Sequence, residues 1–259
     1  MEQKIYHRTT SRILDILELI AANPGIFTLS AISEKLSAPK SSLSPILQEL
    51  VSRNYLTLTS GQKYNIGFTL YNIGSGFLKQ FNFLDEVEKY LQNITNICNE
   101  ASHFSILSGG DVLYLKKANS PEPIRMVSFI GNRIPAYSTA LGKALLLDYT
   151  PSQIRALYPH GLQKVTENTI TDFDTLNAQL EEGRKNGFTY EIEESNQYIR
   201  CIAVPIRKNG KVVAAVSIAT PVFRYNEEKE QLIKVLLFDV EKKLENLINN
   251  IDIDFNDLL

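Results

Sequence analysis

The chain has 259 residues, of which 44% are hydrophobic, and it carries a formal net charge of −2. This length allows two modest domains or one large one, each with an ordinary packed core. No apolar run approaches the length of a membrane span, and the polar start MEQKIYHRTTSR lacks the apolar stretch of a secretory signal. The two cysteines, Cys98 and Cys201, are too few for a disulfide framework, so a reducing cytoplasm is the expected compartment.

Charge is distributed unevenly along the chain. Residues 1–80 contain 8 Lys and Arg against 5 Asp and Glu, whereas the remaining residues contain 19 against 24. A basic first part and an acidic remainder suit a protein that brings only its first part close to phosphates.

The segment from Phe27 to Phe68 has the order of a winged helix-turn-helix, following a first helix that ends at Asn23-Pro24-Gly25. A second helix is expected to open at Thr28 or Ser30, and a third follows the turn at Ser37-Ala38-Pro39. Residues 55–59 then alternate with period two, Ser60-Gly61 supplies a turn, and residues 62–66 return as the partner strand. This order favours duplex DNA as the partner.

The third helix is the expected reader of the major groove, because short polar side chains stand near its start and can hydrogen-bond base edges. Arg8, Arg12 and Lys63 are expected to contact the phosphate backbone. Pro45 interrupts the pattern, since proline is tolerated in the first turn of a helix but not in its interior. We therefore expect the helix to start late, with Ser41 or Ser42 as its N-cap; a kink between Ser41 and Pro45 is the alternative. The predicted DNA-binding residues are Arg8, Arg12, Lys40, Ser41, Ser42, Ser44, Gln48 and Lys63.

Two helical segments, residues 68–80 and 84–99, with a break near Phe81-Asn82, predict a linker. Beyond them the pattern changes to short strands and helices, which predicts an α+β domain. Asn209-Gly210 lies between two apolar runs and is the strongest hairpin signal. The expected strands are residues 103–108, 112–117, 124–130, 200–207 and 211–220, and the expected helices are residues 138–147, 151–157, 172–186 and 226–250.

Several polar residues of this second part invite a chemical interpretation. Ser138 and Thr139 stand at a predicted helix start, which favours an anion, although N-capping alone explains Ser138. Gly142-Lys143 lacks the preceding glycine of a phosphate loop, because Tyr137 occupies that position. The carboxylates Glu191, Glu193 and Glu194 are more typical of a solvated face than of a metal site, and no cofactor is expected.

The remaining candidates are single residues in otherwise ordinary surroundings. His103 and His160 are isolated, and structural roles are expected for both. Cys201 lies in an apolar strand and is expected to be a small buried side chain that lines a pocket at most. Ser217 interrupts the run VVAAVSIAT, so it either faces a pocket or forms a local hydrogen bond.

Taken together, the chain resembles the IclR family of bacterial transcription regulators from about Thr10 to Asn250. The resemblance is carried by the helix-turn-helix and by motifs in the family's order: Tyr64-Asn65-Ile66-Gly67, Pro135, Ser138 to Ala144, Gly187-Phe188, Glu193-Glu194, Arg200 to Ile206 and Val216-Ser217-Ile218 before Pro221. It implies a winged helix-turn-helix in residues 1–67, linker helices in 68–99 and a GAF-like effector-binding domain in 100–259. It also implies homodimers or dimers of dimers, without a membrane partner.

The resemblance further implies an effector site for an organic acid or an aromatic metabolite. Together with Ser138, it predicts these effector-binding residues: Met126, Ile134, Ser138, Ala140, Leu141, Glu191, Ile199, Cys201, Ser217 and Ala219. The N–H groups of Ala140 and Leu141 would hold a carboxylate. Glu191 stands where the family often has Asp and Ala219 where it often has Ser, so the ligand is expected to differ from small keto acids. Pro45 replaces a residue that is usually Arg or similar, which predicts a different operator.

The expected function is therefore a DNA-binding transcriptional regulator, a repressor by family habit, controlled by a small-molecule effector such as an organic or sugar acid. One alternative is an enzyme, a hydrolase or transferase that acts on a small carboxylate through Glu191, Cys201 or Ser138, but no activated nucleophile and base are visible in the sequence. The other is a scaffold whose helix-turn-helix only dimerises.

Overall fold

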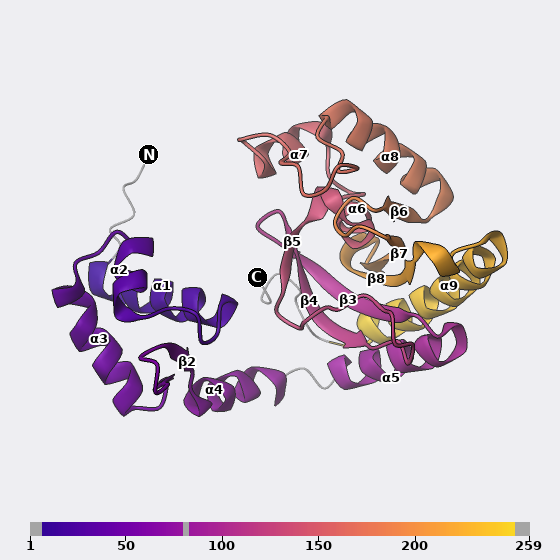
Figure 1. Ribbon diagram of the computed structural model, residues 1–259. Coiled ribbons are helices and arrows are strands. Elements are labelled where there is room, and N and C mark those ends of the chain that lie inside the picture. The colour runs from indigo at the N-terminus through magenta and orange to yellow at the C-terminus, as the bar shows by residue number, and fades with distance from the viewer. Residues whose placement is uncertain (1–6, 80–82, 252–259) are drawn as a thin grey trace. The chain divides into compact units, whose positions relative to one another are not determined.

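The computed structural model describes residues 7–79 and 83–251, and the chain divides into two compact units, residues 1–81 and 82–259 (Figure 1). The first unit contains the helices α1 Arg8–Ala22, α2 Leu29–Lys35 and α3 Lys40–Ser52, the strands β1 Leu56–Leu58 and β2 Tyr64–Ile66, and the helix α4 Phe68–Lys79. The two strands pair antiparallel, with Leu56 opposite Ile66. This order confirms the predicted winged helix-turn-helix.

Helical periodicity gives the first unit its core. Ile16, Ile20 and Ile32 are fully buried together with residues of α3 and β1. Thr28 caps α2, because its hydroxyl oxygen accepts from the Ala31 N–H. The β1–β2 hairpin is the wing, and it is hydrogen-bonded to the segment that leads into α2. The Tyr64 N–H donates to the Phe27 carbonyl, and the Tyr64 carbonyl accepts from the Gly25 N–H.

The second unit is built on a six-stranded antiparallel sheet in the order β5-β4-β3-β8-β7-β6. Its strands are β3 Ala101–Ser108, β4 Asp111–Ala118, β5 Arg133–Pro135, β6 Thr189–Ile192, β7 Ile199–Lys208 and β8 Lys211–Pro221. Its helices are α5 Phe83–Cys98, α6 Ala140–Leu145, α7 Pro151–Leu157, α8 Phe173–Asn186 and α9 Glu227–Asn249. The sheet with its flanking helices confirms the α+β prediction.

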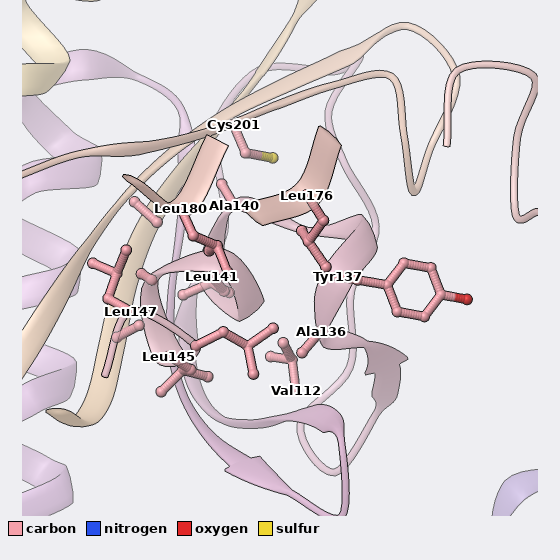
Figure 2. Close-up of a cluster of buried hydrophobic side chains, with 14 of the residues drawn as sticks. Val112, Ala136, Tyr137, Ala140, Leu141, Leu145, Leu147, Leu176, Leu180 and Cys201 are labelled. Carbon is pink, nitrogen blue, oxygen red and sulfur yellow. The ribbon is translucent and has the colours of Figure 1, made fainter. Parts of the chain in front are cut away.

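Helices lie against both faces of this sheet (Figure 1). α5 and α9 pack against each other and against the central strands, whereas α6 contacts β7, β8 and β6, with α8 beyond it. Figure 2 shows the resulting core, in which Ala140, Leu141 and Leu145 of α6 lie near Leu176 and Leu180 of α8. α6 is thus held in the centre of a core layer, and this fixes the position of its N-terminus over the sheet.

The units divide inside the predicted linker range 68–99. α4 belongs to the first unit and α5 to the second, where Leu84, Val87 and Leu91 are buried. The predicted break at Phe81 and Asn82 lies outside the described residues.

One predicted strand is wrong. Burial alternates over residues 125–129, with Met126 and Ser128 buried and Val127 and Phe129 exposed, but residues 124–130 form no strand. The edge of β4 is instead paired by Arg133–Pro135. Alternation reports only which side chains face inward, and here two side chains face inward without a strand ladder of backbone hydrogen bonds.

The predicted hairpin turn is confirmed. Asn209 and Gly210 both have positive φ, 51° and 79°, as a two-residue hairpin between β7 and β8 requires. Gly187 ends α8 in the left-handed conformation and leads into β6, a four-residue strand that the sequence pattern did not indicate.

Candidate functional site

The third helix begins earlier than predicted. α3 starts at Lys40 after Pro39 and runs without interruption through Pro45, so the expected late start at Ser41 or Ser42 is wrong. Proline removes only the hydrogen bond to the Ser41 carbonyl, and because Ser41 and Pro45 are both exposed, water can satisfy that carbonyl. The buried side of the helix, Leu43 and Leu47, is unaffected.

The outer face of α3 presents side chains that are free to bind. Lys40, Ser41 and Gln48 are exposed and Ser44 is half-buried, and within the described ranges none of the four has a side-chain hydrogen bond or ion pair. Ser42 differs, because its hydroxyl donates to the Pro39 carbonyl at 2.7 Å. Four of the five polar residues predicted near the start of this helix are thus available to a partner.

The predicted phosphate contacts lie on two other elements of the first unit. Arg8 and Arg12 are on α1, where Arg8 is exposed and Arg12 half-buried, and Lys63 is exposed immediately before β2. None of the three forms an ion pair with another residue that the structure describes. Their charges are therefore uncompensated, as phosphate binding requires.

The second unit contains a small polar cavity between the start of α6 and the sheet. Its volume is about 10 Å³, room for about one water molecule. The lining residues are His103, Tyr114, Met126, Thr139, Ala140, Leu141, Glu191, Ser195, Cys201 and Ser217. Six of the predicted effector residues are among them: Met126, Ala140, Leu141, Glu191, Cys201 and Ser217.

Strand register explains how residues so distant in sequence meet at this cavity. Cys201 pairs with Glu191 on β6 and with Ala219 on β8, while Ser217 pairs with His103 on β3. Residues opposite each other in neighbouring strands project to the same face of a sheet. That face is the one covered by α6.

Four predicted residues lie outside the cavity lining. Ile134 is half-buried against the core cluster, and Ile199 and Ala219 are buried within it. Ser138 is fully buried, and its hydroxyl donates to the Pro135 carbonyl rather than capping α6. Capping is done by Thr139, whose oxygen accepts from the Gly142 N–H at 2.9 Å, so the explanation of Ser138 as an N-cap is wrong.

Glu191 is the most unusual group of the cavity. Its Oε1 accepts from the N–H groups of Glu194 and Ser195, at 2.9 and 3.0 Å, and from the Ser195 hydroxyl. Its Oε2 is buried and has no hydrogen-bond partner among the described residues. Burial raises the pKa of this carboxyl group, and the Ser195 N–H and the nearby Cys201 thiol lower it.

The expectation of a solvated carboxylate face is wrong for Glu191 and Glu194, which are 1% and 4% exposed. Sequence reasoning also missed Lys143 as a buried cation. Its Nζ lies 2.6 Å from Glu194 Oε1 and donates to the Tyr190 carbonyl at 3.0 Å, and its side chain is 1% exposed. Lysine and carboxylate side chains are almost never fully buried unless they are paired. The sequence gives no sign of this pair, because residues 143 and 194 come together only in the folded protein.

His103 also lines the cavity, whereas only a structural role was expected. Its Nε2 lies 2.8 Å from the Ser128 hydroxyl, and its ring meets the Tyr114 ring edge-on at 5.2 Å. Burial lowers the pKa of His103 to about 3, so the ring is neutral at physiological pH. The other isolated histidine, His160, is exposed on the surface.

Cys201 lies on the sheet near Ala140 (Figure 2). Burial, with the nearby Glu191 charge, raises the pKa of its thiol well above the ordinary value, so the sulfur is a neutral thiol.

Residues 7–79 and 83–251 contain no group of three or more His, Cys, Asp or Glu side chains arranged to hold a metal ion. In the same ranges no helix is long and apolar enough to cross a membrane.

Two family models match the chain. Residues 9–59 match the IclR helix-turn-helix domain, and residues 76–245 match the C-terminal domain of the bacterial transcriptional regulator IclR. The second match alone spans well over half of the chain, and together the two matches include both units.

Individual relatives agree with this match. The HTH-type transcriptional regulator BhcR of Paracoccus denitrificans is 29% identical over 240 residues, covering 92% of this chain and 86% of its own length. The HTH-type transcriptional repressor AllR of Escherichia coli is 27% identical over 221 residues, covering 84% and 82%. A solved IclR homologue from Microbacterium hydrocarbonoxydans, complexed with 4-hydroxybenzoate, has a TM-score of 0.76 at 22% identity and covers 92% of this chain and 99% of its own.

Proposed function

The chain belongs to the IclR family of bacterial transcriptional regulators, and we propose that its operator affinity is set by a small hydroxylated carboxylate bound beside Glu191. It is a helix-turn-helix DNA-binding regulator with an effector-binding C-terminal domain. We propose the class of ligand, the residues that hold it and the direction of control, for which repression is inferred from the named repressor among its relatives.

The unpartnered Oε2 of Glu191 is the observation that carries the proposal. A buried polar atom without a partner is costly, and native proteins seldom keep one without a role. An ionised carboxylate only accepts hydrogen bonds, whereas the protonated form, which burial favours, also carries one O–H donor. The complement of Glu191 is therefore a hydroxyl on the ligand, which can donate to the ionised form and accept from the protonated form.

The ligand's carboxylate is assigned to the other side of the cavity. Ala140 and Leu141 are the first residues of α6, whose N–H groups lack intrahelical partners, and both line the cavity. The ligand that fits both ends carries a carboxylate at one end and a hydroxyl at the other. The neutral His103 ring and the Ser217 hydroxyl offer further polar contacts without adding charge.

A cavity of about 10 Å³ is too small for such a molecule, so binding must widen it. Met126 stands on the segment 124–130, which is not part of the sheet, so moving this wall of the cavity breaks no strand ladder. An effector changes operator affinity only through its different affinity for the two states. We propose that widening at Met126 is the structural difference that distinguishes them.

The DNA contacts proposed for the first unit fall into two chemical classes, contacts to base edges and contacts to the phosphate backbone. Ser41, Ser44 and Gln48 reach base edges, Ser42 supports the start of the helix, and Lys40 contacts a phosphate or guanine. Arg8, Arg12 and Lys63 hold the phosphate backbone. Homodimers or dimers of dimers in the cytoplasm, with one recognition helix on each half-site, complete the proposal.

An enzymatic role is not favoured by the chemistry of the cavity. The Cys201 thiol is neutral, and His103, whose pKa is lowered to about 3, is a poor general base. We therefore propose that the cavity binds its ligand without turnover. Turnover of a bound carboxylate that disappears in Cys201→Ser, with operator binding unchanged, would support an enzyme instead.

Effector recognition is tested by matched pairs of carboxylates with and without a hydroxyl, such as 4-hydroxybenzoate and benzoate, in a thermal-shift screen. The hydroxylated member is expected to raise the melting temperature more. Glu191→Gln and Ser217→Ala are each expected to weaken a hit by about tenfold, because each removes one polar contact worth about 1–1.5 kcal/mol. Affinity is measured by isothermal titration calorimetry.

Glu193→Gln is the matched control, because Glu193 is in the same turn but does not line the cavity. The affinity of Glu193→Gln for the carboxylate should equal that of the unmodified protein. Equal binding by Glu191→Gln, or a preference for the member without a hydroxyl, would contradict the assignment of Glu191.

A further inference from the structure

The buried ion pair behind the effector cavity is not explained by the needs of core packing. Lys143 and Glu194 have side chains 1% and 6% exposed, and their Nζ and Oε1 atoms are 2.6 Å apart. Replacing a buried ion pair by apolar side chains of similar volume is often neutral or stabilising. Lys143 also lies on α6 among residues that are all buried, where an apolar side chain would serve packing as well.

A chain of contacts leads from this pair to the cavity. The N–H of Glu194 donates to Glu191 Oε1 at 2.9 Å, so the residue whose side chain binds Lys143 also holds the cavity carboxylate through its backbone. The neighbouring Ser195 adds its own N–H and hydroxyl to the same oxygen. Fixing the Glu194 side chain therefore fixes the turn that orients Glu191.

The outer side of this turn is also held. The Glu194 carbonyl accepts from the hydroxyl of Thr169 at 2.7 Å and from that of Thr166 at 3.1 Å. Lys143 binds the inner side twice, through the Glu194 carboxylate and the Tyr190 carbonyl. The turn between β6 and β7 is thus clamped between α6 and the segment that precedes α8.

The result is an asymmetric carboxylate. Glu191 Oε1 is saturated by the turn, whereas Oε2 has no partner among the described residues and belongs to a residue that lines the cavity. We propose that Lys143 is a positioning residue of the effector site: through Glu194 it holds the turn of residues 191–195 so that Glu191 presents its free oxygen, Oε2, to the effector. This inference rests on the proposed function and assigns a role to a residue that does not line the cavity itself.

The charges around Glu191 support this role. Burial raises the pKa of both Glu191 and Glu194. At Glu191 the Ser195 N–H and the nearby Cys201 thiol lower the pKa, the charge of Glu194 raises it and the charge of Lys143 on α6 lowers it. At Glu194 the charge and hydrogen bond of Lys143 oppose the effect of burial. The other titratable groups facing the site are neutral: His103 of β3 has its pKa lowered by burial, and burial raises the pKa values of Tyr114 of β4 and Cys201 of β7. Burial favours the protonated form of Glu191, and loss of the Lys143 charge would favour that form further.

The test measures the ionisation of Glu191 directly in the full-length protein. Glutamate labelled with ¹³C at the side-chain carboxyl is incorporated, and the Glu191 signal is identified by its loss in Glu191→Gln. Lys143→Met is expected to raise the titration midpoint of this signal by about one pH unit or more, because a positive charge is lost from a buried site. Glu194→Gln removes a negative charge and is expected to lower the midpoint, which keeps the test valid if Lys143→Met does not fold.

Lys164→Met is the matched control, since Lys164 forms an exposed pair with Glu167 at 2.6 Å, and it should leave the midpoint unchanged. A midpoint that stays unchanged in Lys143→Met, or that shifts in the same direction in both variants, would overturn the proposal. The titration needs no ligand. Failure of every carboxylate to bind would therefore contradict the proposed effector class, whereas only the titration decides the role of Lys143.

Discussion

Gly142→Ala is expected to prevent stable folding of the second unit. A Cβ atom at this position would lie 2.0 Å from the Ala136 carbonyl oxygen and 2.3 Å from the Ala136 Cα. These are backbone atoms that no side-chain rotation can move away, so α6 would have to leave the 3₁₀ turn Ala136–Ser138. The expected loss in free energy of unfolding is at least about 3 kcal/mol, measured by urea denaturation followed by circular dichroism.

Gly210→Ala is the matched control in the same unit. Gly210 has a positive φ, but no atom lies within 4 Å of the position that a Cβ would occupy, so only backbone strain opposes the change. The expected cost is about 1 kcal/mol. If Gly142→Ala cost no more than Gly210→Ala, the close packing of α6 against residues 136–138 would be incorrect, and with it the position of the effector cavity.

The double variant Ser44→Ala, Gln48→Ala is expected to lose specific DNA binding by at least about 100-fold, because each base contact contributes about 1–3 kcal/mol of discrimination. Both side chains lie on the outer face of α3 and have no side-chain hydrogen bond within the described part of the chain, so the fold should be unchanged. Binding is measured by fluorescence anisotropy on a fragment that the unmodified protein selects from genomic DNA.

The salt dependence separates base contacts from phosphate contacts. The double variant removes no charge, so its slope of log affinity against log salt should equal that of the unmodified protein. Lys63→Ala is expected to reduce that slope by about one per protomer and to weaken all sequences alike. Ser52→Ala, at the end of the same helix, is the control. If the double variant kept its preference for the selected fragment, the assignment of α3 as the helix that reads the DNA sequence would be contradicted.

The helices and turns that were predicted correctly from the sequence carry strong local signals. Helical spacing of isoleucine and leucine located α1 and α3, and Asn209-Gly210 located the β7–β8 hairpin. The start of α3 was mispredicted because local rules for proline do not say which side of the helix the lost hydrogen bond faces. At Pro45 it faces solvent, where the penalty is smallest.

The parts that could not be predicted depend on long-range pairing. Residues 124–130 alternate like a strand, but whether a strand forms depends on a partner, and β4 pairs with Arg133–Pro135 instead. Lys143 and Glu194 are 51 residues apart, and no pattern near either one indicates that both are buried. A shared effector site for Glu191 and Cys201 was predicted only through family resemblance, and the strand register supplies the physical reason that they meet.

Regulation requires that a ligand in the second unit change the DNA affinity of the first. The direct measurement is the affinity for the selected DNA fragment with and without a saturating hydroxylated carboxylate identified by thermal shift. The unmodified protein is expected to change its affinity at least about tenfold, a coupling free energy of about 1.4 kcal/mol, and Glu191→Gln is expected to change little at the same ligand concentration. Equal DNA affinity with and without the bound carboxylate would contradict control of the operator by this cavity.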